Sequence, residues 1–176
     1  ADFPGGKGAN QAVAAARLGA DVRLVATIGQ DGFGQAMEAF LAAEGIDLGA
    51  LARTGAAPTG MGYITVDAAS QNTIVVVPGA NLAWDAAALP VAAIAAGDFV
   101  IGQFEIPRDI TLLAFREAKA RGATTILNPA PGGPIDGDWF AAIDILVLNE
   151  TELEIVGGRT LDFADPDAVR SAAQAL

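Results

Sequence analysis

The chain has 176 residues, a formal charge of −11 and neither cysteine nor histidine. This composition excludes disulfides, thiolate nucleophiles, Cys/His zinc sites and histidine acid–base chemistry, so any catalysis has to use carboxylates, lysine or bound ions. The acidic balance argues against nucleic acid or an anionic membrane as a partner, and with no apolar run long enough to span a bilayer we expect one soluble, cytoplasmic domain.

The most informative segment is residues 5–19, a glycine-rich turn with one lysine that runs into an alanine-rich helix expected over residues 9–18. Its glycines let the backbone approach a ligand closely, and the first N–H groups of the helix can face an oxygen-rich small molecule. Lys7 adds a mobile donor. On the pattern alone, a tight loop with an ordinary surface lysine is as good an interpretation as a binding turn.

The later elements mostly alternate between strands and helices. The pattern predicts strands over 22–28, 98–103, 124–128 and 144–148, and helices over 33–44 and 108–121. Short apolar runs separated by helices are typical of a parallel sheet covered on both faces, which is an α/β fold. Ligands of such sheets lie beyond the carboxyl ends of the strands, where Glu105, Asn128 and Asn149 fall.

The segment 59–78 breaks this alternation. Two β-prone runs, 61–66 and 73–77, are joined by polar residues with no helix between them, which predicts an antiparallel hairpin. Such a hairpin is either an addition to the edge of the main sheet or a lid that excludes water from a reaction.

Five motifs in order resemble those of the ribokinase, or PfkB, family of carbohydrate kinases. They are the turn and helix at 5–19, the hairpin from Thr59 to Gly79-Ala80-Asn81, the segment 103–107, the segment 128–131 and the segment 149–152. The resemblance covers nearly all of the chain. It implies a ribokinase-like three-layer α/β/α sheet with a small antiparallel β lid at about 59–78, within a partial kinase domain over residues 1–176.

The resemblance also implies an activity, the ATP-dependent phosphorylation of D-ribose to ribose 5-phosphate, with Mg²⁺ and a monovalent cation such as K⁺. Asn149 and Glu152 would help to place ATP, and Glu152 would hold Mg²⁺ through water. Without the resemblance, the same two residues are interpreted as a helix cap and a first-turn carboxylate, and both roles are compatible. The lid would supply the contact of a homodimer. The implied sugar-binding residues are Gly6, Lys7, Gly8, Ala9, Asn10, Gly62, Ile64 and Glu105.

Other family features are expected outside this sequence. Family members begin with a strand that carries an Asn-x-Asp sugar clamp, and their catalytic aspartate opens a helix well after the Asn-x-x-Glu motif. We therefore expect the catalytic base and the cation site beyond residue 176, and a chain that is inactive by itself. Ala95-Ala96-Gly97-Asp98 has matching letters, but it precedes an expected strand, so Asp98 is predicted to be a turn residue.

Two alternatives remain open from the sequence. In the first, the protein is a kinase whose substrate is another sugar or a nucleoside, because few specificity residues are present. In the second, the chain is a non-catalytic sugar-binding or regulatory module.

Overall fold

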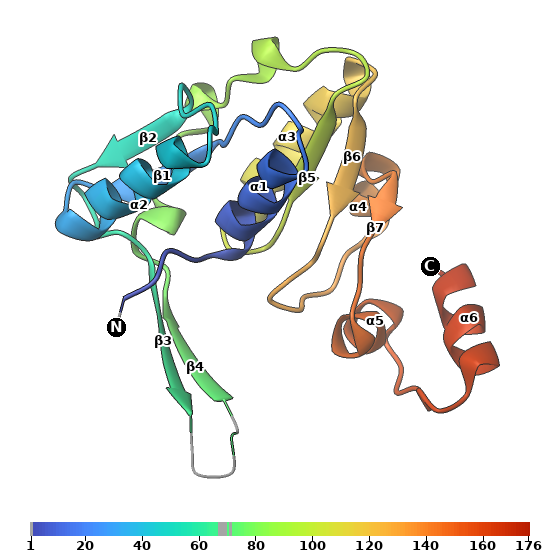
Figure 1. The fold of residues 1–176 in the computed structure, drawn as a ribbon. Coiled ribbons are helices and arrows are strands. Elements are labelled where there is room, and N and C mark those ends of the chain that lie inside the picture. The colour runs from blue at the N-terminus through green and yellow to red at the C-terminus, as the bar shows by residue number, and fades with distance from the viewer. Residues whose placement is uncertain (1, 67–69, 71) are drawn as a thin grey trace. The chain divides into compact units, whose positions relative to one another are not determined.

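The computed structural model describes residues 2–66, 70 and 72–176 of the chain. These residues form two compact units, unit 1 (Ala1–Pro90) and unit 2 (Val91–Leu176). Each unit contains parallel strands with helices packed beside them, as the α/β prediction requires (Figure 1). Within the described part of the chain, no helix is long and apolar enough to cross a membrane.

Unit 1 is built around two helices and a pair of parallel strands. In chain order these are α1 (Lys7–Arg17), β1 (Ala26–Gly29), α2 (Gly32–Ala43) and β2 (Leu51–Thr54). Ala12, Leu41 and Ile46 form its buried cluster, with Val13, Val22 and Met37 among the apolar side chains packed against them. The strand predicted over 22–28 begins only at Ala26, and residue 23 before it makes a single isolated bridge to residue 47.

The predicted hairpin is confirmed. β3 (Met61–Val66) and β4 (Asn72–Val77) pair antiparallel, with Met61 opposite Val77 and Ile64 opposite Ile74. Most of the connection predicted between these strands, residues 67–69 and 71, lies outside the described residues. Figure 1 shows the hairpin projecting from the rest of unit 1, and it is followed by the 3₁₀ helices η1 (Gly79–Leu82) and η2 (Ala86–Ala88).

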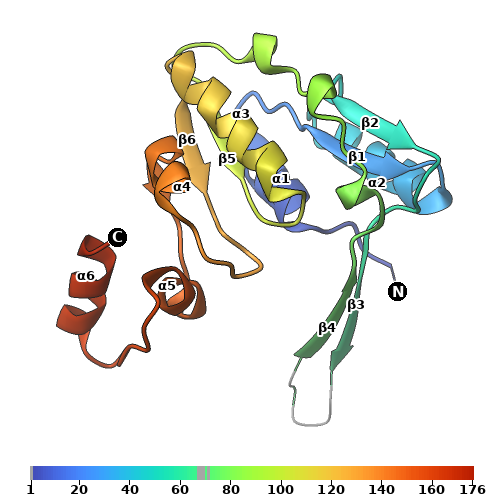
Figure 2. The same cartoon turned by 180° about the vertical axis from the view of Figure 1, so that it is seen from behind.

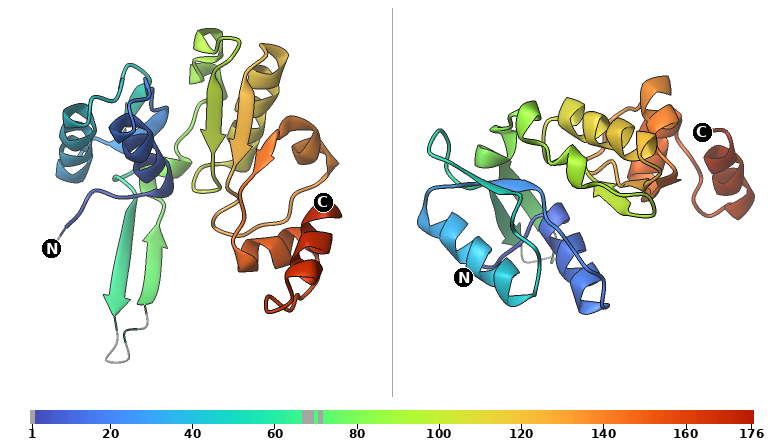
Figure 3. Two further views of the ribbon diagram at one scale, coloured as in Figure 1. Left: turned by 45° about the vertical axis from the view of Figure 1, so that its right-hand side comes forward. Right: turned by 90° about the horizontal axis from the view of Figure 1, so that it is seen from above.

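In chain order the elements of unit 2 are η3 (Val91–Ala93), β5 (Phe99–Gly102), α3 (Arg108–Ala120), β6 (Thr124–Leu127), α4 (Gly137–Ala142), β7 (Ile145–Leu146), α5 (Glu150–Gly157) and α6 (Pro166–Gln174). The three strands form a parallel sheet in the order β5-β6-β7. Its core joins Phe115 of α3, Leu127 of β6 and Trp139 of α4, and these helices cover one face of the sheet (Figure 2). Figure 3 shows α5 and α6 following the sheet.

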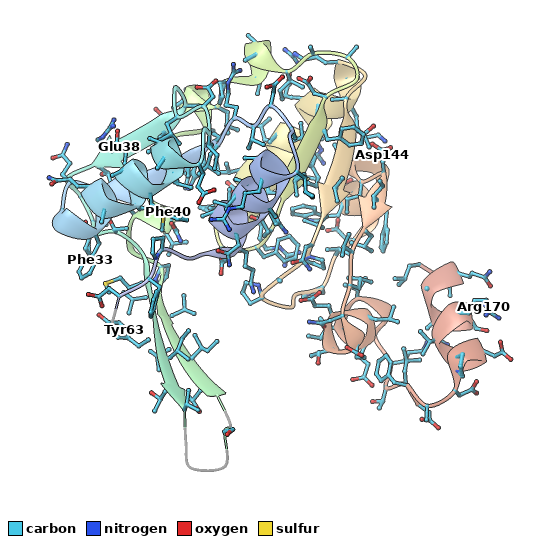
Figure 4. All side chains as sticks on the ribbon, in the orientation of Figure 1. Phe33, Glu38, Phe40, Tyr63, Asp144 and Arg170 are labelled. Atoms are coloured by element: carbon cyan, nitrogen blue, oxygen red, sulfur yellow. The ribbon has the colours of Figure 1, made fainter. Side chains whose placement is uncertain are left out.

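Carboxylates fix the amino ends of two of these strands. Asp98 accepts a hydrogen bond from the Ala95 N–H at 2.8 Å directly before β5, so its prediction as a turn residue is confirmed. Asp144, labelled in Figure 4, accepts from the Thr125 N–H at 2.9 Å and from Lys119 Nζ at 2.5 Å. The hydrogen bond from Lys119, followed by that from the Thr125 backbone, lowers the pKa of Asp144 below its ordinary value.

Candidate functional site

The glycine-rich turn leads directly into α1. Gly6 precedes the helix with φ 96° and ψ 141°, a backbone conformation that side chains disfavour, and its carbonyl accepts a hydrogen bond from the Asn10 N–H at 2.9 Å. No side chain of the described residues caps this helix. Its amino end therefore presents N–H groups and the positive end of the helix dipole, an arrangement suited to hydroxyl or phosphate oxygens.

The other sugar-binding residues predicted in unit 1 lie at the start of α1 and on the hairpin. Lys7, Gly8 and Ala9 are half-buried in the first turn of α1, and Asn10 is exposed. Gly62 and Ile64 lie at alternate positions of β3, so they share one face of the hairpin. Figures 1 and 3 show the hairpin and the first turn of α1 on the same side of unit 1.

The nucleotide-side residues predicted in unit 2 are brought together by the sheet. Asn128 directly follows β6 and Asn149 follows β7 after two residues, and parallel strands end at the same edge. Asn128 Nδ2 donates to Glu152 Oε2 at 3.0 Å, and Asn149 Nδ2 donates to Glu152 Oε1 at 3.1 Å. Three polar residues from two strand ends and one helix therefore form a single cluster.

The same cluster starts helix α5 as a capping box. Asn149 Oδ1 accepts from the Glu152 N–H at 2.8 Å, while Glu152 Oε2 accepts from the Asn149 N–H at 3.1 Å. The interpretation of these residues as a helix cap with a first-turn carboxylate is thus confirmed. Glu152 is 6% exposed, and these contacts hold its carboxylate in one orientation.

The hydrogen bonds that Glu152 accepts limit how its carboxylate could contact a metal ion. A carboxylate offers about four acceptor positions, and three are used by Asn128 Nδ2, the Asn149 N–H and Asn149 Nδ2. The position that remains, on Oε1, suits one hydrogen bond from a water molecule of a hydrated cation better than direct coordination.

Glu105 lies half-buried in the loop between β5 and α3. The Phe104 N–H donates to the Ala130 carbonyl at 3.0 Å, which ties this loop to the segment after β6. The Phe104 ring meets Trp139 edge-on at 5.1 Å between centroids, and the Arg108 guanidinium lies 4.1 Å from the centroid of the Phe104 ring. Arg108 also donates to the Pro134 carbonyl, so Glu105 is carried by a loop that is fixed on both sides.

The sequence did not predict one polar contact, which joins Asp31 to Thr59. Asp31 lies at the start of α2 and contacts Thr59, which stands directly before the hairpin. Hydrogen bonds from the Gly34 N–H, the Thr59 hydroxyl and the Thr59 N–H lower the pKa of Asp31. The available signal was Asp31 as a helix N-cap, which does not point to Thr59, 28 residues later in the chain.

Comparison with known proteins identifies the family. The model of the pfkB family carbohydrate kinase matches residues 2–176. The ribokinase of Staphylococcus aureus (strain COL) is 45% identical over 159 residues, which are 89% of this chain and 52% of that protein. The ribokinase of Haemophilus influenzae (strain ATCC 51907 / DSM 11121 / KW20 / Rd) is 42% identical over 171 residues, 96% of this chain and 55% of that protein.

Solved structures agree with the sequence comparison. The Arabidopsis thaliana ribokinase, complexed with ribose and ATP, has a TM-score of 0.85 and 29% identity over 97% of this chain and 56% of its own. The Thermotoga maritima ribokinase has a TM-score of 0.81 and 32% identity over 98% of this chain and 57% of its own. The chain spans about half the length of the curated relatives it matches. It has the ribokinase-like α/β fold, and it belongs to the pfkB family of carbohydrate kinases.

Proposed function

We propose that the protein transfers the γ-phosphoryl group of ATP to the primary hydroxyl of D-ribose, giving ribose 5-phosphate. The observation that carries this proposal is the 45% and 42% identity to two ribokinases over 89% and 96% of the chain. Two separate features support it: the N-terminus of α1 leaves N–H groups for oxygen ligands, and the polar cluster in unit 2 offers ordered amide and carboxylate side chains. Since ATP is the donor, we place the reaction in the cytoplasm.

In this proposal the sugar is held mainly by unit 1. The backbone of Gly6, Gly8 and Ala9 approaches the sugar closely, while Lys7 and Asn10 donate to its hydroxyl groups. Gly62 and Ile64 cover the sugar from the lid, and the Glu105 carboxylate accepts from a hydroxyl. A lid that excludes water limits hydrolysis of ATP while the sugar reacts.

ATP and Mg²⁺ are assigned to the cluster in unit 2. Asn149 helps to place the nucleotide, and Glu152 holds a water molecule of the hydrated Mg²⁺ through the remaining acceptor position of Oε1. The cation would neutralise charge on the phosphate oxygens, and K⁺ would serve as a monovalent cofactor. Positioning and electrostatic stabilisation supply most of the rate in such reactions, and the order that the capping box gives to these side chains suits that role.

We also propose that the lid joins two copies of the protein. Its apolar side chains are exposed on both faces: Ile64 is 65% exposed on one, and Tyr63 and Val75 are 54% and 57% exposed on the other. Tyr63 projects from β3 in Figure 4. If one face covers the sugar, the opposite face requires a partner. A dimer in analytical ultracentrifugation that Val75→Lys dissociates would support this arrangement, and a monomeric parent protein would contradict it.

The test is ADP release by the product of the intact gene with ATP, Mg²⁺ and K⁺. Ribose is compared with deoxyribose, fructose and adenosine at matched concentrations, and we expect the highest kcat/KM for ribose. Faster turnover of another acceptor would overturn the ribose assignment while leaving the kinase. Ribose binding without ADP release from any acceptor would overturn the kinase and favour a sugar-binding module.

A further inference from the structure

The hairpin is joined to the body of unit 1 through one carboxylate. Asp31 Oδ2 accepts a hydrogen bond from the Thr59 N–H at 2.8 Å, and its Oδ1 accepts from the Thr59 hydroxyl at 2.7 Å. The same Oδ1 accepts from the Gly34 N–H at 2.8 Å and so caps α2. One side chain therefore fixes the start of a helix and the residue from which the hairpin begins.

Thr59 completes the connection from the other side. Its side chain is almost buried, with the residue 8% exposed, and its hydroxyl oxygen accepts from the Gly29 N–H at 2.9 Å. The hydroxyl thus donates to Asp31 and accepts from the last residue of β1. Serine can make both bonds, whereas valine has nearly the same shape and can make neither.

Glycines allow this contact by letting one backbone lie directly on another. A Cβ added to Gly29 would lie 2.4 Å from the Thr59 nitrogen, and one added to Gly34 would lie 2.3 Å from the Gly29 oxygen. The return strand is held in the same way, since a Cβ on Gly79 would lie 2.3 Å from the Pro58 oxygen. The Pro58 carbonyl also accepts from the Ala80 N–H at 2.7 Å.

Both strands of the hairpin therefore leave from one rigid junction. Thr59 and Gly60 precede β3, and Pro78 and Gly79 follow β4. Beyond the junction, apolar side chains on both faces are more than half exposed, as at Ile64 (65%) and Val75 (57%). The direction in which the hairpin projects is accordingly set at the junction rather than by packing along its length.

We propose that Asp31 and Thr59 are positioning residues that hold the lid hairpin at the angle from which it closes over the sugar. This inference rests on the proposed function, because it assumes that the hairpin covers an acceptor. Neither residue touches the substrate. Loosening their contact leaves the sugar-binding residues of α1 in place but lets the lid leave the sugar more often.

The test compares Thr59→Val with Thr59→Ser in the intact protein, and Thr54→Val serves as the matched control. The Thr54 hydroxyl oxygen accepts a local hydrogen bond from the Ala56 N–H at 3.1 Å, and among the described residues it shares no hydrogen bond with Asp31 or Thr59. We expect Thr59→Val to raise KM for ribose about tenfold, which corresponds to roughly one or two lost hydrogen bonds. KM for ATP should stay constant, and ATP hydrolysis without sugar should rise relative to transfer. Thr59→Ser should restore all three values.

A second measurement keeps the inference testable if Thr59→Val does not fold. In the wild-type protein without ligand, the amide hydrogens of Gly29, Gly34 and Thr59 should exchange slowly, because each donates to the junction. Exchange as fast as that of exposed loops would overturn the junction itself. Equal KM for ribose in Thr59→Val, Thr59→Ser and wild type would overturn its role in positioning the lid. Failure of the wild type to use ribose would instead count against the proposed function, whatever the exchange rates show.

Discussion

Replacing Glu152 by glutamine tests the cluster at the edge of the unit 2 sheet. The glutamine oxygen can take the place of Oε2 and accept from Asn128 Nδ2 and the Asn149 N–H. Its NH₂ group then faces Asn149 Nδ2, which formerly donated to Oε1. Asn149 cannot turn its amide over without losing the 2.8 Å bond that its Oδ1 accepts from the residue 152 N–H. Two donors, one of them on the buried side chain of residue 152, are therefore left facing each other.

The expected loss of stability follows from that single conflict. A hydrogen bond to a charged group contributes about 1.5–3 kcal/mol, and we expect Glu152→Gln to lower the free energy of unfolding by that amount. Glu150→Gln is the matched control, because Glu150 lies in the same first turn of α5 but is exposed. It loses only the favourable contact with the helix dipole, about 0.3–1 kcal/mol.

Urea unfolding of the intact protein, followed by tryptophan fluorescence without nucleotide, measures both variants. Equal free energies of unfolding for Glu152→Gln and Glu150→Gln would refute the reasoning about the buried cluster. The same variants address Mg²⁺ separately: KM for Mg-ATP should rise in Glu152→Gln alone, with KM for ribose unchanged. Equal KM values for Mg-ATP in the two variants would contradict the assignment of Mg²⁺ and leave the structural role of Glu152 intact.

Three further changes probe other parts of the molecule. Arg108→Ala removes a cation–π contact worth about 0.5–2 kcal/mol from the loop that carries Glu105, so we expect a lower thermal midpoint and a higher KM for ribose. Gly34→Ala places a methyl group 2.3 Å from the Gly29 oxygen and should destabilise the fold by about 1–3 kcal/mol in urea. The lowered pKa of Asp144 stabilises the fold above the ordinary carboxyl pKa of about 4, and this contribution is lost as the pH falls through the lower folded-state value, so Asp144→Asn should flatten acid unfolding monitored by circular dichroism.

Each of these results has a clear opposite. An Arg108→Ala protein with unchanged KM for ribose would show that the stack does not position Glu105. A Gly34→Ala protein as stable as wild type would contradict the close backbone approach. An Asp144→Asn protein that loses stability on acidification as steeply as wild type would contradict the role of this carboxylate at low pH.

Much of the fold could be predicted because single features of the sequence determine it. The apolar runs at 98–103 and 124–128 have the length and character of parallel strands, and both strands are present. The expected burial is wrong for β5, where Phe99 is 66% and Ile101 45% exposed. β2 was not predicted, because only one of its four residues, Leu51, is buried, and so short a segment shows no alternation of apolar and polar residues. α4 was not predicted either, because six residues are too few to show a helical period.

In the candidate site, too, some contacts could be predicted from the sequence and others could not. Asn128 and Asn149 could be placed together because neighbouring parallel strands end at one edge, a consequence of topology alone. The contact of Asp31 with Thr59 could not be predicted, because it depends on where two turns meet and on glycines that let their backbones touch. The capping box of α5 was visible in the order Asn-x-x-Glu, but the third donor, Asn128, comes from a distant segment.

Glu105 follows β5, whereas Asn128 and Asn149 follow β6 and β7, and this arrangement bears on how specificity for a different substrate could arise. The side chains of Asn128, Asn149 and Glu152 bond to one another, whereas Glu105 lies on the loop held by Phe104 and Arg108. Only backbone bonds, from Asn128 to Gly102 and from Phe104 to Ala130, are described between the two segments. Side-chain substitutions in the Glu105 loop that keep these backbone bonds can therefore accumulate without breaking the bonds among the three side chains. Under the proposed function, such substitutions would allow the acceptor to change during evolution while the donor is kept, and the loop after β5 would be the place to engineer a different acceptor.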